Sequence, residues 1–580
     1  MPEENKNKLE MMRHSLSHIM AAAVLKLWPK VKFAIGPAVD NGFYYDFDFG
    51  NIKIGEEDLK KVEEEMKKIV KANLPFEKSE LLIAKAQARE KKSGQTYKLE
   101  LAQDLKKQGE KSVSYYKQGD FEDLCRGPHL KSTGQVQNGS WKLDKLAGAY
   151  WRGDEKNKML TRIYGIAFAT KAELDNYLKM MEEAEKRDHK KQGRELDLFS
   201  FHPEAPGSAF WHPKGMIIWN ELEKFGKFLR KKYNYQEIQT PILAKSSLWK
   251  TSGHWDHYKA SMFYFDVEKE TYCLKPMDCP FNIKIYQTQP RSYKELPIRY
   301  TEIGRILRNE KSGELNGLLR VRHLTQDDSH IFLMKNQVGQ EISTLIKMTK
   351  EYYGIFGIKP EFFLSTRPED FTGEVKDWDE AEKDLKDALK KEKVVYEIKE
   401  KDGAFYGPKI DIDIKDALGR SWQLATIQLD FQLPQKFSLD YVDSDGQKKR
   451  PVMIHAAVFG SFERFIGIIL EHFAGAFPVW LSPVQVKIVS VGASHVEFCK
   501  KLAAEFELEN IRVEVDESDE TVGNKIRKAV AEKVRYMLVI GDREMASNKL
   551  SVRDRGEKMT REIGKKEFIQ EIKKKIKERK

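Results

Sequence analysis

The sequence predicts a multidomain α+β protein. Its length is the first reason, because 580 residues correspond to about three or four domains at roughly 100 to 200 residues each. The second reason is a change of pattern along the chain. Helices mixed with short strands come first, a strand-rich region follows, and strands alternating with helices come last. Hydrophobic residues make up 40% of the chain, which is enough to form several cores.

Residues 1–168 are predicted to form one α+β domain. The segments 42–48 and 162–168 are rich in aromatic and β-branched side chains, as is typical of strands. Between positions 171 and 195, apolar residues recur every three or four positions among many charged ones. Residues 169–196 are therefore predicted to be an exposed linker helix.

The next predicted domain, 197–481, contains two strands, 300–304 and 318–322, with turn residues between them. This hairpin would hold Arg308 and Arg320 near each other. Two guanidinium groups beside the carboxylate of Glu310 suit a triphosphate with its magnesium ion, because a guanidinium grips phosphate oxygens with two hydrogen bonds. Ordinary surface ion pairs would explain the same residues equally well.

The last predicted domain, 482–580, alternates strands with helices, which is typical of an α/β unit. The predicted strands are 486–491, 512–515 and 536–540, and the predicted helices are 495–506 and 524–533. The basic tail has Ile569, Ile572 and Ile576 at helical spacing, which predicts a surface helix.

Composition limits the class of protein. The net charge of +11 favours a polyanionic partner, although lysine-rich surfaces also occur in proteins that bind no nucleic acid. The four cysteines are too scattered for a disulfide framework and fit a reducing compartment. The sequence has no apolar run of about 18 residues and no signal-peptide pattern, so we expect a cytoplasmic protein with no membrane partner.

Residues with metal-binding side chains gather in the N-terminal domain. His14 and His18 lie four residues apart on one predicted helix face, and Cys125 and His129 repeat that spacing. No other histidine or cysteine occurs before residue 168. Residue types alone favour a zinc site here.

Three segments resemble motifs 1, 2 and 3 of the class II aminoacyl-tRNA synthetases. They are the helix 214–231 with the strand 236–240 that ends at Pro241, the segment from Arg308 to Arg320, and residues 458–467 with Arg464. Within that class, the segments 277–280 (MDCP), 325–330 (TQDDSH) and 453–455 (MIH) are similar to those of threonyl-tRNA synthetases. The resemblance runs from about residue 10 to the C-terminus.

The resemblance implies a fold for each domain. Residues 197–481 would form the catalytic domain around the antiparallel sheet of class II synthetases. Residues 1–168 would be an editing domain, and residues 482–580 an anticodon-binding domain. The small ubiquitin-like domain that often precedes the editing domain is expected to be absent.

The resemblance also implies roles for single residues of the catalytic domain. One zinc ion per chain would be held by Cys279, His330 and His455. Residues expected to bind threonine are Asp328, Tyr406 and Gln428. Those expected to bind ATP, which enters with Mg²⁺, are Arg308, Glu310, Arg320, Gln423 and Arg464. Arg308 and Arg464 would act in catalysis, and His254 matches a histidine proposed to assist transfer to tRNA. Leu324 stands where a phenylalanine commonly packs on adenine.

The N-terminal residues gain a different role from the resemblance. In threonyl-tRNA synthetases this constellation hydrolyses mischarged seryl-tRNA without an obligatory metal, whereas the related alanyl editing domain uses the same spacing to hold zinc. The closer family favours metal-free hydrolysis. The residues that match this editing site are His14, His18, Lys98, Asp123, Cys125 and His129. The residues that match anticodon contacts are Lys533, Glu544 and Arg553, although such residues near strand ends are usually only solvated.

The implied function is ATP-dependent ligation of L-threonine to tRNA(Thr) through a threonyl-adenylate, with editing of seryl-tRNA(Thr). Motif 1 implies a homodimer. The alternative is a non-catalytic RNA-binding regulatory paralogue, which would have no reason to keep the zinc ligands together with Arg308 and Arg464. A class II synthetase for serine or proline is opposed by the cysteine and two histidines.

Overall fold

A computed structural model describes residues 3–416, 419–547 and 549–580 of the chain. The chain forms two compact units, Met1–Glu182 and Glu183–Lys580, each with hydrophobic cores of its own. Among the described residues, no helix combines the length and the apolar character that crossing a membrane requires.

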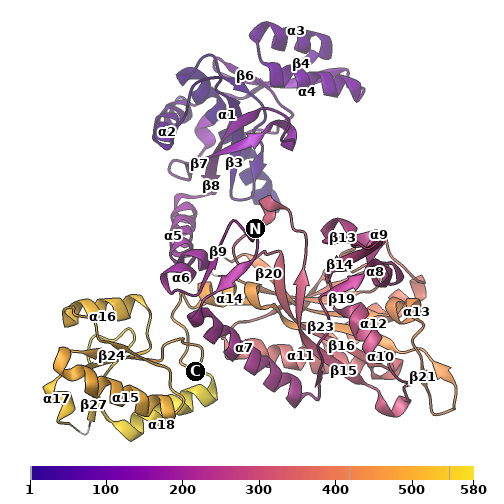
Figure 1. Cartoon of the computed structure of the whole chain (residues 1–580). Helices are drawn as coiled ribbons and strands as arrows, with labels where there is room; N and C mark the ends of the chain where they lie inside the picture. The colour runs from indigo at the N-terminus through magenta and orange to yellow at the C-terminus, as the bar shows by residue number, and fades with distance from the viewer. Residues whose placement is uncertain (1–2, 417–418, 548) are drawn as a thin grey trace. The chain divides into compact units, whose positions relative to one another are not determined.

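The first unit is built on a five-stranded antiparallel sheet in the order β1-β3-β8-β7, with β2 added to β3 (Figure 1). A second sheet has the order β4-β5-β6. The strands are β1 (Lys32–Phe33), β2 (Ala38–Val39), β3 (Gly42–Asp48), β4 (Glu77–Leu82), β5 (Ser112–Gln118), β6 (Phe121–Leu124), β7 (Trp141–Tyr150) and β8 (Met159–Ala167). The helices are α1 (Glu3–Leu27), α2 (Glu56–Lys71), α3 (Ile83–Ser93) and α4 (Thr96–Lys107).

Helix α1 carries the first two candidate histidines of this unit. Leu16, Ile19 and Ala23 are fully buried on it, at the spacing that puts three side chains on one helix face. That face packs against β3 and α2. The packing fixes α1, and with it the positions from which His14 and His18 project.

The predicted linker helix is two helices, α5 (Lys171–Arg187) and α6 (His189–Glu195). The break falls at Asp188, whose side chain accepts hydrogen bonds from the backbone N–H groups of Lys190 at 2.8 Å and Lys191 at 3.1 Å. An aspartate with these hydrogen bonds is an N-cap, which favours the start of a new helix rather than the continuation of the preceding one. The prediction of a single helix was therefore wrong.

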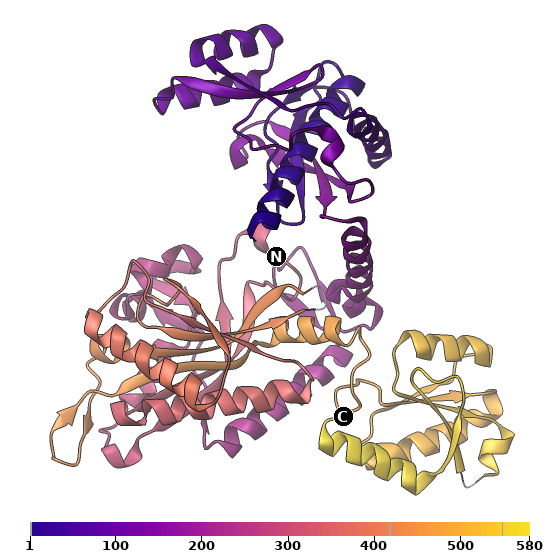
Figure 2. The same ribbon diagram turned by 180° about the vertical axis from the view of Figure 1, so that it is seen from behind.

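The second unit contains an eight-stranded sheet in the order β11-β15-β16-β23-β20-β19-β17-β18. All its inner pairings are antiparallel, and only the edge pairs β11 with β15 and β17 with β18 are parallel. Helices α11 and α12 lie on one face of this sheet, as the rear view shows (Figure 2). The strands are β11 (Gln236–Glu237), β15 (Ile298–Leu307), β16 (His323–Leu333), β17 (Glu361–Ser365), β18 (Tyr396–Lys399), β19 (Lys409–Lys415), β20 (Ser421–Asp430) and β23 (Val452–Ser461).

Smaller elements surround this sheet. The helices are α7 (Pro213–Lys232), α8 (Ser246–Ser252), α9 (His254–Tyr258), α10 (Cys279–Tyr286), α11 (Val338–Ile355), α12 (Val375–Lys391), α13 (Gln432–Lys436) and α14 (Phe462–His472). The remaining strands are β9 (Phe199–Phe201), β10 (Ala209–Trp211), β12 (Leu243–Lys245), β13 (Tyr264–Val267), β14 (Glu270–Leu274), β21 (Tyr441–Val442) and β22 (Lys448–Lys449). With the eight-stranded sheet they form the antiparallel α+β core that the resemblance to class II synthetases implied.

Two predicted strands of this region differ from the structure. Residues 318–322 are irregular, and β16 begins only at His323. The reason is that backbone N–H groups of this segment donate hydrogen bonds to groups outside the sheet. Leu318 N–H donates to a histidine ring nitrogen at 3.1 Å, and Arg322 N–H donates to the Gly207 carbonyl at 2.7 Å. The predicted strand 236–240 shortens to two residues, since Thr240 N–H donates to a carboxylate instead.

The C-terminal part confirms the predicted α/β pattern. Its sheet has the order β25-β24-β26-β27-β28, parallel over the first three strands and antiparallel over the last two. The strands are β24 (Val486–Ser490), β25 (Val513–Asp516), β26 (Tyr536–Ile540), β27 (Lys549–Asp554) and β28 (Arg561–Gly564). The helices are α15 (Val496–Leu508), α16 (Val522–Ala531), α17 (Asp542–Met545) and α18 (Lys565–Glu578). The tail does form a helix, and its Ile572 is fully buried.

Candidate functional site

The largest concentration of predicted residues lines one cavity of about 410 Å³ in the second unit. Eleven of the twelve residues predicted for the catalytic domain line it, and only His254 does not. The eleven are Cys279, Arg308, Glu310, Arg320, Asp328, His330, Tyr406, Gln423, Gln428, His455 and Arg464. They come from α10, β16, β20, β23, α14 and the loops beside these elements.

Two of the arginines are held by neutral backbone acceptors. Arg308 Nε donates to the Pro276 carbonyl at 3.3 Å. Arg464 donates from Nε to the Leu319 carbonyl at 2.9 Å and from a terminal nitrogen to the Gln423 carbonyl at 3.0 Å. Burial, and then the charges of the arginines around it, lower the pKa of Arg464. Arg308 and Arg464 therefore give the cavity a positive charge that suits a polyanion.

The third arginine, Arg320, is paired with acids. Its Nε donates to Glu310 at 2.9 Å, and a terminal nitrogen donates to Glu314 at 2.8 Å. These side chains are partly exposed, so the pairs are weak and can exchange partners. An incoming phosphate can replace the glutamates as the partner of Arg320.

Cys279, His330 and His455, which we name the pocket cluster, also line this cavity. Their ligand atoms lie within 4.8 Å of one another, and all three side chains are buried. Sheet register explains this, because His330 and His455 are direct partners across β16 and β23. The sequence placed them 125 positions apart, so only strand pairing brings them together.

The pocket cluster fits a zinc ion. His455 Nε2 donates to the Asp430 carboxylate at 2.8 Å, so Nδ1 is the ring nitrogen left to bind a metal. Metal-bound histidines usually have such a hydrogen-bond partner on their second nitrogen. His330 Nδ1 is buried without a hydrogen-bond partner among the described residues. Burial, followed by the charge of Asp328, raises the pKa of the Cys279 thiol well above its usual value. A dication would satisfy these groups and stabilise the thiolate.

Polar groups beside the pocket cluster can orient a small substrate. The Tyr406 hydroxyl donates to Gln428 Oε1 at 2.8 Å. Burial, followed by the charge of Glu302, raises the pKa of Asp328 to about 7. His254 is fully buried, its Nδ1 lies 2.8 Å from Ser252 Oγ, and its Nε2 lies 3.9 Å from Cys279 Sγ. Burial lowers the pKa of His254 to about 3, so its ring is neutral.

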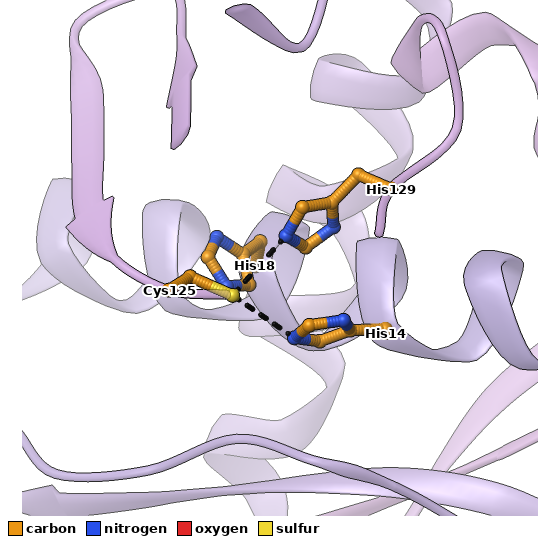
Figure 3. A group of neighbouring side chains, drawn as sticks. All are labelled: His14, His18, Cys125 and His129. Atoms are coloured by element: carbon orange, nitrogen blue, oxygen red, sulfur yellow. Dashed lines mark hydrogen bonds between the residues drawn. The ribbon is translucent and has the colours of Figure 1, made fainter. Parts of the chain in front are cut away.

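The first unit brings a second group of predicted residues together, as Figure 3 shows. This group, named the N-terminal cluster, consists of His14, His18, Cys125 and His129. Cys125 Sγ lies 3.2 Å from His14 Nε2 and 3.4 Å from His129 Nε2. The histidines come from α1 and the loop after β6, which also carries Cys125. Burial raises the pKa of the Cys125 thiol to about 11 and lowers the pKa of His14.

The two other predicted residues of this site form an ion pair behind the cluster. Lys98 Nζ lies 2.7 Å from the Asp123 carboxylate, and both side chains are buried. The Tyr45 hydroxyl also donates to Asp123, and His18 Nε2 lies 3.9 Å from it. All six residues predicted for this site therefore lie in one place.

The three residues predicted for the anticodon do not gather in the same way. Lys533 precedes β26, whereas Glu544 lies on α17, which follows that strand. They therefore lie near opposite ends of a strand of five residues, which spans about 17 Å. Arg553 pairs with Met537 within the sheet and donates to the Glu557 carbonyl at 2.9 Å. Glu544 accepts a hydrogen bond from the Gly541 N–H at the start of α17.

Sequence reasoning missed several residues that position the cavity. Asp430, which is fully buried, accepts a hydrogen bond from His455. Its place as a lone aspartate at the end of an apolar strand could have indicated a buried role in the sequence. His189 is 1% exposed and lies 2.8 Å from the Glu471 carboxylate, 282 positions away. No spacing in the sequence connects that pair.

Comparison with known families gives a match in each part of the chain. The profile described as "tRNA synthetase class II core domain (G, H, P, S and T)" matches residues 258–473. The profile "Anticodon binding domain" matches residues 485–575. The profile "Threonyl and Alanyl tRNA synthetase second additional domain" matches residues 113–164.

Individual proteins match over nearly the whole chain. The threonine–tRNA ligase of Clostridium tetani (strain Massachusetts / E88) is 52% identical over 561 residues, which cover 97% of this chain and 87% of that protein. The ligase of Clostridium botulinum (strain Langeland) is 51% identical over 98% of this chain and 88% of that protein. The crystal structure of the RNA-binding domain of threonyl-tRNA synthetase from Cryptosporidium parvum Iowa II has a TM-score of 0.65 at 40% identity, covering 67% of this chain and 98% of that one. The chain therefore belongs to the threonyl-tRNA synthetases, the class II enzymes that ligate threonine to tRNA.

Proposed function

We propose that the cavity of the second unit activates threonine as a threonyl-adenylate and transfers it to tRNA(Thr), and that the first unit hydrolyses seryl-tRNA(Thr). One observation carries the first half of this proposal. Three arginines and the pocket cluster line a single cavity. A nucleotide and a small amino acid fit such a combination of cationic groups and metal ligands. The alternative of a non-catalytic RNA-binding paralogue leaves this combination without a purpose.

The arginines act by positioning and by neutralising charge. The threonine carboxylate attacks the α-phosphorus of ATP, the bond to the leaving phosphate breaks, and pyrophosphate departs. Arg308 binds the α-phosphate, Arg464 lies against the base, and Arg320 exchanges its glutamates for phosphate oxygens. Glu310 offers oxygen ligands to the Mg²⁺ that accompanies ATP, and Gln423 contacts the nucleotide. Fixed donors of this kind stabilise the charge that develops at phosphorus.

The pocket cluster is proposed to select threonine. A zinc ion held there would offer an open coordination position to the amino and hydroxyl groups of the substrate. Asp328, Tyr406 and Gln428 hold the amino group in place. Valine has nearly the shape of threonine but no hydroxyl, and a site built to engage a hydroxyl rejects its absence by roughly 10⁴ to 10⁵.

Transfer and assembly complete the proposed reaction. The ribose hydroxyl of the terminal adenosine attacks the carbonyl carbon of the adenylate, and AMP leaves. The neutral ring of His254 is the proposed acceptor of the hydroxyl proton. The helix α7 and the chain up to Pro241 match motif 1, and on that basis we propose a homodimer.

Editing follows from the limits of recognition. Serine keeps the hydroxyl and amino groups of threonine and lacks one methyl group, which gives only about 1 to 3 kcal/mol, or roughly 10 to 200-fold discrimination. A second, hydrolytic site is then needed. His14 or His18 would activate water there as a general base without an obligatory metal. Lys98 and Asp123 would hold the pocket in shape. The proposed anticodon contacts are Lys533, Glu544 and Arg553.

The synthetic half is tested by pyrophosphate exchange with each amino acid in turn. We expect exchange with threonine, far weaker exchange with serine and almost none with valine. The variant His330→Ala should lose zinc and threonine activation together. His323→Ala is the matched control, because His323 lies on the same strand but does not line the cavity. Full zinc content and unchanged activation in His330→Ala would overturn the assignment of the pocket cluster.

The editing half is tested with preformed seryl-tRNA. The double variant His14→Ala/His18→Ala should hydrolyse it far more slowly than the parent, so that seryl-tRNA accumulates while threonine charging continues. Lys26→Ala, on the same helix with a largely exposed side chain, is the control. Equal deacylation rates in the double variant and the parent would end the editing assignment for these histidines.

A further inference from the structure

The N-terminal cluster has the four donor atoms of a complete metal site close together. Tetrahedral zinc with one sulfur and three nitrogen ligands places its donor atoms about 3.3 to 3.6 Å apart, given bonds of about 2.3 Å to sulfur and 2.0 to 2.1 Å to nitrogen. Cys125 Sγ lies 3.2 Å and 3.4 Å from two imidazole nitrogens. All four candidate ligand atoms lie within 4.8 Å of one another. The two sulfur–nitrogen distances are therefore close to those of a four-ligand zinc site.

The far sides of the rings already have partners. His14 Nδ1 lies 3.2 Å from the Pro128 carbonyl. A carbonyl oxygen can only accept, so Nδ1 carries the proton and Nε2 presents its lone pair to the cluster. His129 Nδ1 lies 3.3 Å from Ser15 Oγ, which leaves its Nε2 to face Cys125. Metal-bound histidines are oriented by such contacts on their second nitrogen.

Hydrogen bonding within the cluster is incomplete. The one proton of the Cys125 thiol can be donated to only one of the two nitrogens that face it. His18 Nδ1 is buried and has no hydrogen-bond partner among the described residues. His18 as a whole is 2% exposed, so water reaches it poorly. A cation in the centre would satisfy the lone pairs that the bare cluster leaves unmatched.

A metal ion can reach the cluster without unfolding the unit. Cys125, His14 and His129 are all partly exposed, and Cys125 also lines a cavity of about 530 Å³. The nearby carboxylate of Asp123 is already paired with Lys98 at 2.7 Å. Binding therefore depends on the cysteine and the imidazoles, which are ligands that zinc prefers.

We propose that the N-terminal cluster binds one exchangeable zinc ion with all four side chains, and that the bound ion switches off hydrolysis in this unit. Four protein ligands complete a tetrahedral site and leave no position for water, unlike the three of the pocket cluster. The same imidazole lone pairs cannot both bind zinc and accept a proton from water. The second half of this inference rests on the proposed editing function, whereas the first half does not.

Zinc binding is measured on the full chain. The protein is saturated with zinc chloride, freed of excess ion by gel filtration and analysed for metal. We expect one more zinc per chain in the parent than in His14→Ala/His18→Ala. The variant His129→Ala keeps three of the four ligands, so its zinc content should lie between those two values. His202→Ala, which removes an exposed histidine outside both clusters, should match the parent. Equal zinc content in the parent and the double variant would overturn the proposal.

Deacylation of preformed seryl-tRNA is measured on the same samples, with a chelator and then with added zinc. Because bound zinc would remove the general base, the deacylation rate should fall about 10²-fold when zinc is added and recover when the chelator removes it. If added zinc instead raises the deacylation rate, the ion is catalytic, and the proposal of a closed, inhibitory site is wrong. If the metal-free parent has no deacylase activity, the editing function and the switch both fail, and the zinc content alone decides the binding site.

Discussion

The variant His189→Ala tests how the adenylate cavity is held in shape. His189 lies on α6 and joins two distant segments. Its Nδ1 donates to the Glu471 carboxylate of α14 at 2.8 Å, and its Nε2 accepts from the Leu318 N–H at 3.1 Å. The next residue, Leu319, offers the carbonyl that holds Arg464, and Arg320 follows. The histidine therefore fixes the loop that carries Arg320 and whose Leu319 carbonyl orients Arg464.

The expected loss of stability follows from these contacts. Truncation leaves the Leu318 N–H buried without its acceptor, which costs about 1 to 3 kcal/mol. It also removes a hydrogen bond to the Glu471 carboxylate, and a hydrogen bond to a charged group contributes about 1.5 to 3 kcal/mol. Glu471 keeps the backbone N–H of residue 189 at 3.3 Å and Arg420 at 3.6 Å. We therefore expect a loss of about 3 kcal/mol in the free energy of unfolding.

The same change should weaken ATP binding. If the loop becomes free to move, the KM for ATP in threonine-dependent pyrophosphate exchange should rise about tenfold, equivalent to about 1.4 kcal/mol. The control is Lys191→Ala, because Lys191 is an exposed residue of the same helix and its truncation should change stability by less than about 0.5 kcal/mol. Reduced stability with an unchanged KM would show a purely structural anchor and refute the positioning role. Unchanged stability would refute the energetic reasoning itself.

Three further outcomes are expected. Burial raises the pKa of Glu463 to about 7, above the usual value of about 4.3. The folded state therefore keeps a proton that the unfolded chain releases between these values, and the free energy of unfolding should fall as pH rises from about 4.5 to 7. In denaturant titrations across that range, Glu463→Gln should flatten this dependence, and an unaltered slope would contradict it. Leu324→Phe should lower the KM for ATP several-fold by stacking on adenine, while a higher KM would exclude that role for a cavity-lining residue. Sedimentation should show a dimer, and a fully active monomer at micromolar concentration would disprove it.

The family, the class II core and the α/β C-terminal part could be predicted because their signals are local. Motif residues such as those around Arg308 and Arg464 lie within short segments, and alternation of strands and helices is visible in one pass along the chain. The strand predicted at 318–322 was wrong for a physical reason. Its residues alternate as a strand should, but Leu318 and Arg322 give their N–H groups to tertiary partners rather than to a neighbouring strand.

Long-range pairings were outside the reach of sequence reasoning. His330 and His455 meet only because β16 and β23 adopt one particular register, and a shift by one residue would turn one ring to the opposite face of the sheet. The buried partners Asp430 and Glu471 have no sequence signal that links them to their histidines. Their positions depend on strand pairing and helix packing.

The choice of partners for the three arginines distinguishes fixed charge from exchangeable charge in the cavity. Arg308 and Arg464 are oriented by backbone carbonyls, which hold the guanidinium groups in place without neutralising their positive charge. Arg320 is instead paired with Glu310 and Glu314, so it must release an acid before it can bind phosphate. Preorganised donors need no rearrangement at the moment of reaction. The two carbonyl-held arginines are therefore suited to the transition state at the α-phosphorus, and the third is suited to admitting and releasing the outer phosphates.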